Sequence, residues 1–191
     1  MPTFNNETYI SVDVETAGPN PGDYSLLSIG ACTIYGPQEN FYIEIQPINT
    51  RFTGEALEVG KLDLAELKDK GFTPQAAMRK FAEWIGNVTP PNNQPVFVAF
   101  NAPFDWMFVN DYFHRYLGHN PFGHKALDIK AFYMGLMGVP FSETGMRHLA
   151  KRYPEIQTLS HHALDDALDQ ALIFRKLMEE AKKQSRPPIP G

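Results

Sequence analysis

The chain has 191 residues, of which 43% are hydrophobic and 20% are charged, and this balance predicts one globular domain with a sizeable core. The formal net charge of −5 argues against a protein that coats long nucleic acids, because such affinity depends on Lys and Arg. Neither a secretion signal nor an apolar run of 18 residues is found. The single cysteine, Cys32, fits a reducing compartment. Together these features predict a soluble, cytoplasmic protein without membrane contact.

The first third of the chain predicts three antiparallel strands in succession. In residues 8–15, Asp13 and Glu15 alternate with Ile10, Val12 and Val14, which is typical of a strand with one apolar and one acidic face. Turns rich in Gly and Pro separate this strand from two more, at 26–35 and 40–46. Strands joined by short turns form a meander.

Helices and strands alternate in the rest of the chain. Thr73 followed by Pro74 predicts a helix start, because this pair supplies a cap and a residue suited to the first turn. The apolar run 95–100 predicts a buried strand, and a short strand follows at 126–129. Helices are expected at 61–70, 75–88, 101–117, 129–137, 143–153 and 161–183. The fold class is therefore α/β, with a mixed five-stranded sheet and helices on both faces, in one domain (1–186) with a disordered tail (187–191).

Carboxylates gather at two of these elements. Asp13 and Glu15 lie two apart on a strand, so their side chains leave the same face about 7 Å apart. A solvated strand face would also explain this pair. Asp105 follows the strand 95–100 in the first turn of a helix, where ligands bind in α/β sheets but where an acid also complements the helix dipole.

A third group opens the last helix, in the segment Ser160 to Gln170. Asp165 and Asp166 are adjacent and point about 100° apart, so only one of them can face a site. Either His161 or His162, taken alone, is equally compatible with a surface residue. The pattern of residues within each group leaves these alternatives open.

Taken together, the three groups resemble the DEDDh branch of the DEDD exonucleases, which have a ribonuclease H-like fold. The motif D-x-E is matched at 13–15, N-x-x-F-D at 101–105 and H-x-A-L-x-D at 161–166, in the family's order. In the third motif the family's spacing selects His161 and Asp166. The sequence of residues 12–18 is most similar to that of ribonuclease T. Phe100 stands where many relatives have histidine, which implies a drier wall beside Asn101 and no loss of chemistry.

This resemblance implies a 3′–5′ exonuclease that releases 5′-mononucleotides from single-stranded DNA or RNA. The family's metal ligands fall on Asp13, Glu15, Asp105 and Asp166, which would bind two Mg²⁺ or Mn²⁺ ions, with His161 as general base. Substrate contacts are expected from Thr16, Ala17, Leu27, Asn101 and Phe104. Phe104 is a candidate stacking ring, although a core role fits it nearly as well. The resemblance also suggests a homodimer.

Several alternatives stay open at this level. Spacing does not separate DNA from RNA, because that choice depends on contacts to the 2′-hydroxyl. A non-catalytic nucleic-acid-binding or scaffold protein that kept the fold is the rival from another class. Asp128 is a candidate acid behind the metal ligands in the same cleft, and His161 could lie on an ordered helix turn or on a mobile loop. Met134, Met137, Met146, Phe132 and Phe141 are interpreted as helical core.

Overall fold

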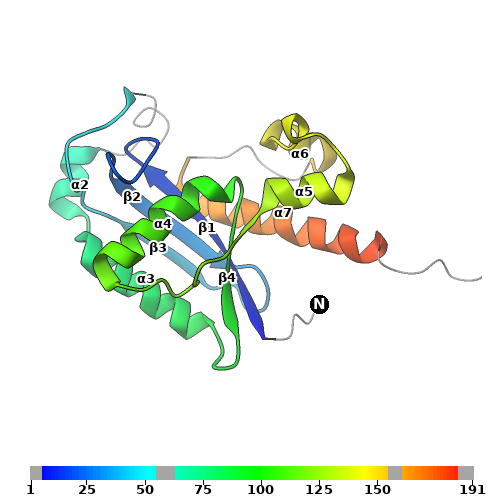
Figure 1. The fold of residues 1–191 in the computed structure, drawn as a ribbon, viewed down its shortest axis with the longest axis horizontal. Helices are drawn as coiled ribbons and strands as arrows, with labels where there is room; N and C mark the ends of the chain where they lie inside the picture. Colours follow the sequence, from blue (N-terminus) through cyan, green and yellow to red (C-terminus); the bar gives the residue numbers. More distant parts are fainter. Residues whose placement is uncertain (1–5, 55–62, 155–160, 185–191) are drawn as a thin grey trace, which may run out of the picture.

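A computed structural model describes residues 6–54, 63–154 and 161–184, which form a five-stranded mixed sheet covered by helices (Figure 1). The strand order is β3-β2-β1-β4-β5. The first three strands pair antiparallel, and β1–β4 and β4–β5 pair parallel, as the sequence predicts. The strands span β1 (Glu7–Thr16), β2 (Leu26–Thr33), β3 (Asn40–Glu44), β4 (Gln94–Ala99) and β5 (Ala126–Asp128).

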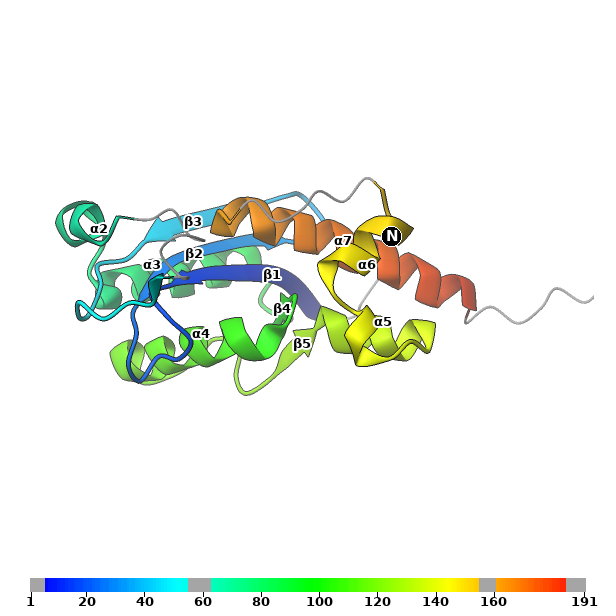
Figure 2. The same cartoon turned by 90° about the horizontal axis from the view of Figure 1, so that it is seen from above.

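Helices cover both faces of the sheet. Apolar residues of α3 and α4 pack on one face, while those of α5, α6 and α7 pack on the other. Figure 2 shows α4 and α7 on opposite sides of β1. The helices span α2 (Leu64–Lys70), α3 (Pro74–Val88), α4 (Ala102–Leu117), α5 (Ile129–Met137), α6 (Met146–Arg152) and α7 (Ala163–Gln184), with a 3-10 turn, η1 (Phe141–Glu143), before α6.

The alternation in β1 divides the core from the acids. Ile10, Val12 and Val14 are buried in the cluster that α3 and α4 complete. Asp13 and Glu15 point to the other face, toward α7, and both are half-buried. A strand of period two thus places its carboxylates on the face opposite its largest apolar cluster.

Local signals fix several helix ends where the sequence predicts them. Thr73 caps α3 by accepting from the amide of Ala76, and Pro74 takes the first helical position. The start of α7 differs from the prediction. His161 and His162 precede the helix, and His161 has a φ of 58°, a left-handed conformation that no helical turn contains. The predicted start of helix 61–70 and the predicted disordered tail 187–191 lie outside the described residues.

The interpretation of five apolar residues as helical core is right for three and wrong for two. Phe132, Met137 and Met146 pack against the core beside α7, whereas Met134 and Phe141 are exposed. Helical spacing cannot separate these two groups, because the neighbour that covers one side of α5 is distant in sequence. Among the described residues, none of the helices is both long enough and apolar enough to cross a bilayer.

Candidate active site

Asp13 and Glu15 form the floor of the site on β1. Asp13 lies opposite Gly30 of β2, and Glu15 lies opposite Ser28. The pairing register shifts between Glu15 and Thr16, so the strand pairing changes directly after the second acid. Both carboxylates therefore sit near the carboxyl end of the central strand, where β4 also ends.

Asp105 lies close to these two acids and belongs to α4, the helix that follows β4. β4 ends at Ala99, and Asn101 turns the chain into α4 with a φ of 69°, in the left-handed region. Asp105 then lies in the first turn of α4, buried, with Oδ1 accepting from the backbone amide of Val14 across 3.2 Å. This hydrogen bond places Asp105 directly beside the residue between the two β1 acids.

Asp166 joins the group because α7 packs very closely on β2. A Cβ atom on Gly30 would lie 2.1 Å from the carbonyl carbon of Ala163, so only glycine fits at this position. Ala163 and Ala167 are both fully buried on this side of α7. Asp166 is 2% exposed, whereas the adjacent Asp165 faces solvent and pairs with His162.

His161 lies at the open side of the cluster. One of its ring nitrogens and carboxylate oxygens of Glu15 and Asp166 all lie within 4.8 Å of one another. Its backbone amide donates to Oδ2 of Asp166 across 3.1 Å. The histidine is thus held by its backbone while its exposed ring faces the acids, and the neighbouring His162 instead stacks on Tyr42 at 4.7 Å.

Gln170 belongs to the site, and sequence reasoning did not find it. Its Nε2 donates to Oδ1 of Asp13 across 2.6 Å, and its Oε1 accepts from the amide of Phe100 across 2.9 Å. It is 1% exposed. The available signal was its position four residues after Asp166, which puts both side chains on one face of α7.

The pKa values of the cluster reflect its crowding. Burial raises the pKa of Asp13 well above its usual range, and repulsion from the neighbouring carboxylates raises it further. Burial and repulsion from Asp166 raise the pKa of Glu15 to about 7. Burial also raises the pKa of Asp105, although hydrogen bonds from backbone amides oppose the shift. Ionising this group is costly unless a cation compensates it.

The donor set fits divalent metal ions. Carboxylate oxygens are the ligands that Mg²⁺ and Mn²⁺ prefer, and the cluster offers them from three different elements. Within the described residues, no Lys or Arg forms a salt bridge with Asp13, Glu15 or Asp105. Hard cations at this position would supply the missing positive charge.

The residues expected to contact substrate fall into two groups. Thr16 and Ala17 follow the β1 acids, and Leu27 lies on β2. All three side chains are buried, with Ala17 and Leu27 packed against Leu67. Asn101 is exposed, and Phe104 is half-buried with its ring centroid 5.5 Å from that of Phe108. Only this second group offers side-chain surface beside the cluster.

Asp128 has a structural task beside the cluster. Its Oδ2 accepts from the amide of Ala102, and its Oδ1 accepts from the amide of Ala131, each across 2.6 Å. It therefore caps α5 and fixes the start of α4. Its charge also contributes to the raised pKa of Asp105, and a role behind the metal ligands stays a prediction.

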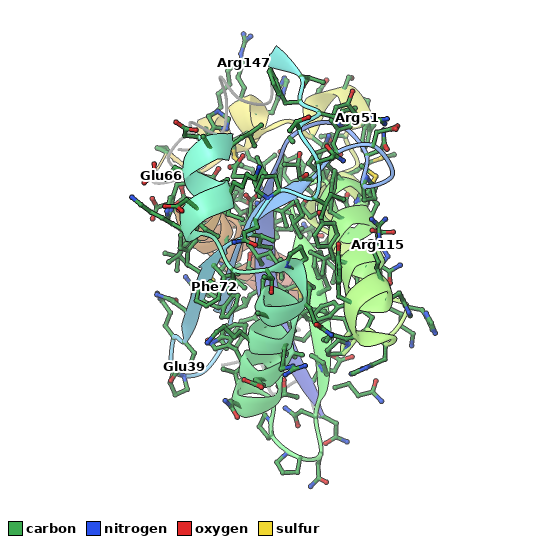
Figure 3. All side chains as sticks on the ribbon, turned by 90° about the vertical axis from the view of Figure 1, so that its left-hand side faces the viewer. Glu39, Arg51, Glu66, Phe72, Arg115 and Arg147 are labelled. Carbon is green, nitrogen blue, oxygen red and sulfur yellow. The ribbon has the colours of Figure 1, made fainter. Side chains whose placement is uncertain are left out.

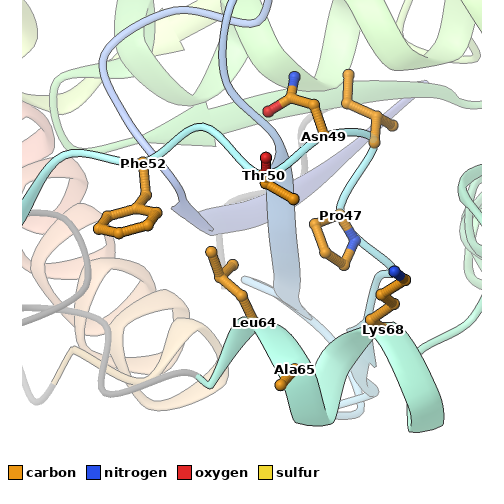
Figure 4. A pocket seen from close by; sticks show the side chains of 8 residues that line it. Pro47, Asn49, Thr50, Phe52, Leu64, Ala65 and Lys68 are labelled. Atoms are coloured by element: carbon orange, nitrogen blue, oxygen red, sulfur yellow. The ribbon is translucent and has the colours of Figure 1, made fainter.

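A separate pocket of about 450 Å³ lies between the loop after β3 and helix α2 (Figure 4). Its lining is largely apolar and includes Phe52, Leu64 and Lys68. Thr53, next to Phe52, donates its amide to the carbonyl of Ala17, so this loop is anchored one residue beyond Thr16. None of the described residues that line this pocket carries a carboxylate, so they do not offer the donor set of the acid cluster.

A mixed sheet with four carboxylates and a histidine at its carboxyl edge defines a class of phosphodiesterases that use metal ions. The family model for exonucleases (RNase_T) matches residues 10–174. The chain is 46% identical to the 3′-5′ DNA exonuclease Cap18 of Escherichia coli over 182 residues, covering 94% of this chain and 97% of the relative. The chain belongs to this exonuclease family, and it is a metal-dependent 3′–5′ exonuclease.

More distant relatives agree in fold. The chain is 26% identical to DNA polymerase III PolC-type of Staphylococcus epidermidis, covering 92% of this chain but 12% of the polymerase. The nuclease domain of 3′hExo, a DEDDh family member bound to rAMP, superimposes with a TM-score of 0.78 at 15% identity, over 94% of this chain and 95% of that one. E. coli Exonuclease I with a dT13 oligonucleotide gives 0.76 at 14% identity, over 93% of this chain and 42% of that one.

Proposed function

We propose that this exonuclease trims single-stranded DNA from the 3′ end and releases 5′-mononucleotides. The observation that carries the proposal is the convergence of Asp13, Glu15, Asp105 and Asp166 on one buried point, with His161 at its open side. The choice of DNA over RNA is supported by the relative that is 46% identical along nearly its whole length and is a DNA exonuclease.

In the reaction, the oxygen of a water molecule forms a bond to the phosphorus while the bond from phosphorus to the 3′-oxygen breaks. The shortened strand keeps a 3′-hydroxyl group. His161 accepts the proton of the water at a ring nitrogen, because its ring faces the cluster from the solvent side. The ring is also exposed, so a proton that it accepts can pass on to solvent.

The four carboxylates hold two divalent cations, and we propose Mg²⁺ as the physiological ion, with Mn²⁺ as a substitute. The cations supply charge neutralisation at the phosphoryl oxygens and a lower pKa for the attacking water. Asp13 interacts with all three other carboxylates, so it would hold a cation together with each of them. Gln170 holds the Asp13 carboxylate in a fixed orientation for this task.

Contacts to the terminal nucleotide come from the groups around the acids. Asn101 and Phe104 present side chains at the start of α4, and Phe104 stacks on a base. Thr16, Ala17 and Leu27 contribute their backbone, since their side chains are buried. A homodimer remains a prediction, which light scattering of the purified protein tests directly.

The experiment is a cleavage assay with 5′-labelled single-stranded DNA and RNA of the same sequence, with Mg²⁺, with Mn²⁺ and with EDTA. Stepwise shortening from the 3′ end is expected with either metal, faster on DNA, and lost in EDTA and in Asp13→Ala. Asp165→Ala is the matched control, because Asp165 is an exposed acid one residue from Asp166. Failure of the wild-type protein to shorten any oligonucleotide would reject the proposed function.

A further inference from the structure

Lys130, in the first turn of α5, has its ammonium group held beside two aromatic rings. Its Nζ atom lies 4.5 Å from the ring centroid of Phe141 and 5.9 Å from that of Phe100. It also lies 3.5 Å from Oδ1 of Asn101, at the limit of a hydrogen bond. A cation over an aromatic face keeps its three N–H donors, so these contacts orient the ammonium without using its donors up.

Lys130 is connected to the acid cluster through Phe100. The backbone amide of Phe100 donates to Gln170, which in turn donates to Asp13, so two hydrogen bonds link the residue whose ring lies near Lys130 to the central acid. Asp128, two residues before Lys130, ties the start of α5 to the start of α4. Figure 2 shows α5 beginning at the end of β5, close to the beginning of α4.

The charge of Lys130 has no neutralising acid in the part of the chain that the structure describes. Lys70 and Arg115, by contrast, form salt bridges with Glu66 and Asp111. The acid nearest to Lys130 in sequence, Asp128, already accepts from two backbone amides at 2.6 Å. Lys130 therefore remains available to an anion from outside the protein.

Phe141 adds an exposed aromatic face next to this charge. It is 56% exposed, although the rest of its neighbourhood on α5 packs Phe132 and Met137 into the core. A single nucleic-acid strand presents the two complementary groups, a phosphate and the flat face of a base, within one nucleotide. The ammonium of Lys130 is complementary to the phosphate, and the ring of Phe141 is complementary to the base.

We propose that Lys130 and Phe141 form a binding site for the substrate strand, in which Lys130 binds a backbone phosphate and Phe141 stacks on a base. The site receives DNA next to the terminal nucleotide that the acids hold. The proposal rests on the proposed function, because the strand bound at this site is the one that the acid cluster cleaves. It adds a contact that none of the three motifs contains.

The chain provides a matched control pair. Lys80 of α3 lies over the ring of Phe72 at 5.2 Å, so the same two residue types meet in a similar contact. Phe72, which is labelled in Figure 3, is 45% exposed. The helix α3 packs on the face of the sheet opposite to Asp13 and α7. If lysine–phenylalanine pairs bound DNA anywhere on the surface, the two pairs would behave alike.

The test measures binding of a 5′-fluorescent dT12 oligonucleotide to the full chain by anisotropy at several salt concentrations, with Ca²⁺ replacing Mg²⁺. Lys130→Gln should raise Kd about fivefold and lower the salt slope by about 0.7, the value for one phosphate contact on a single strand. Phe141→Ala should raise Kd about tenfold through lost stacking and leave the salt slope unchanged. Lys130→Arg should restore both quantities, since it keeps the charge.

Lys80→Gln and Phe72→Ala should change neither quantity. The proposal is overturned if Lys130→Gln and Phe141→Ala weaken binding no more than these two control variants do. Thermal unfolding of each variant shows whether a weaker Kd reflects lost folding, and a Lys130→Gln protein with wild-type Tm is expected. Cleavage with Mg²⁺ is measured separately, so a protein that binds DNA through this site without cleaving it would reject the proposed function alone.

Discussion

Gln170 donates a hydrogen bond to Asp13 across 2.6 Å while it accepts one from the backbone of Phe100. The buried side-chain amide of Gln170, on α7, thus connects the central carboxylate of β1 to the carboxyl end of β4. The Oδ1 atom of Asp13 is fixed by this contact, which leaves Oδ2 as the freer oxygen of that carboxylate.

Replacing Gln170 should therefore weaken metal binding. Gln170→Ala is expected to lower activity about 10- to 100-fold and to raise the Mg²⁺ concentration needed for half-maximal rate, as for other residues that orient metal ligands. The Mg²⁺ titration is the deciding measurement, because a purely structural loss would lower the rate without shifting the titration. Gln94→Ala, at the exposed start of β4, serves as the control.

Gly30→Ala should damage both folding and activity. The added Cβ would lie 2.1 Å from the backbone of Ala163, so α7 would have to move away from β2 and carry Asp166 with it. Overpacking of this kind costs about 1–3 kcal/mol, or several degrees in Tm. Thermal unfolding and the cleavage rate measure the two effects.

The opposite result is expected for a second glycine. Gly86 lies in the last turns of α3, and apart from the adjacent backbone of that helix no atom lies within 4 Å of the position its Cβ would take. Gly86→Ala should leave activity unchanged and stabilise the protein by about 0.5–1 kcal/mol, since alanine favours helix. Equal Tm changes in the two variants would mean that the contact between Gly30 and α7 is not tight.

The metal-free protein should become less stable as the pH rises. The pKa of Glu15 is raised from 4.5 to about 7, so between these values the folded state holds a proton that the unfolded chain has lost. Stability from that proton is present at low pH and is lost as the pH passes the folded value. The raised pKa values of Asp13 and Asp105 act in the same direction.

In EDTA, Tm is expected to fall by about 5 °C between pH 5.5 and pH 8. Saturating Mg²⁺ should remove most of this dependence, because a bound cation favours the ionised carboxylates. Glu15→Gln should also flatten the metal-free curve. A metal-free Tm that rises over this range would contradict the assigned pKa shifts.

Asp128→Ala should destabilise the junction of α4 and α5. Its two hydrogen bonds, to the amides of Ala102 and Ala131, would both be lost, at about 1–2 kcal/mol for a helix cap of this kind. Activity should fall as well, since Asp105 and Lys130 both depend on this junction. Asp63→Ala, which removes the cap of α2 far from the acids, should lower Tm without lowering kcat.

Local sequence patterns predicted many of the strands and helices of this fold. The alternation in β1 predicted the acidic face, Thr73 and Pro74 predicted the start of α3, and the apolar runs predicted β2 and β4. These features depend on residues within a few positions of one another, whose geometry is set by the period of a strand or helix. The order of the three motifs, with the family they resemble, then pointed to the five residues of the cluster.

Other features appeared only when distant elements met. The role of Gln170 depends on where α7 crosses β1, and the need for glycine at position 30 depends on how closely α7 approaches β2. The exposure of Phe141 likewise depends on which surfaces the rest of the fold covers. Sequence alone determined which side chains could do the chemistry, whereas tertiary packing decided which atoms face one another, because contacts between helices and strands have no period along the chain.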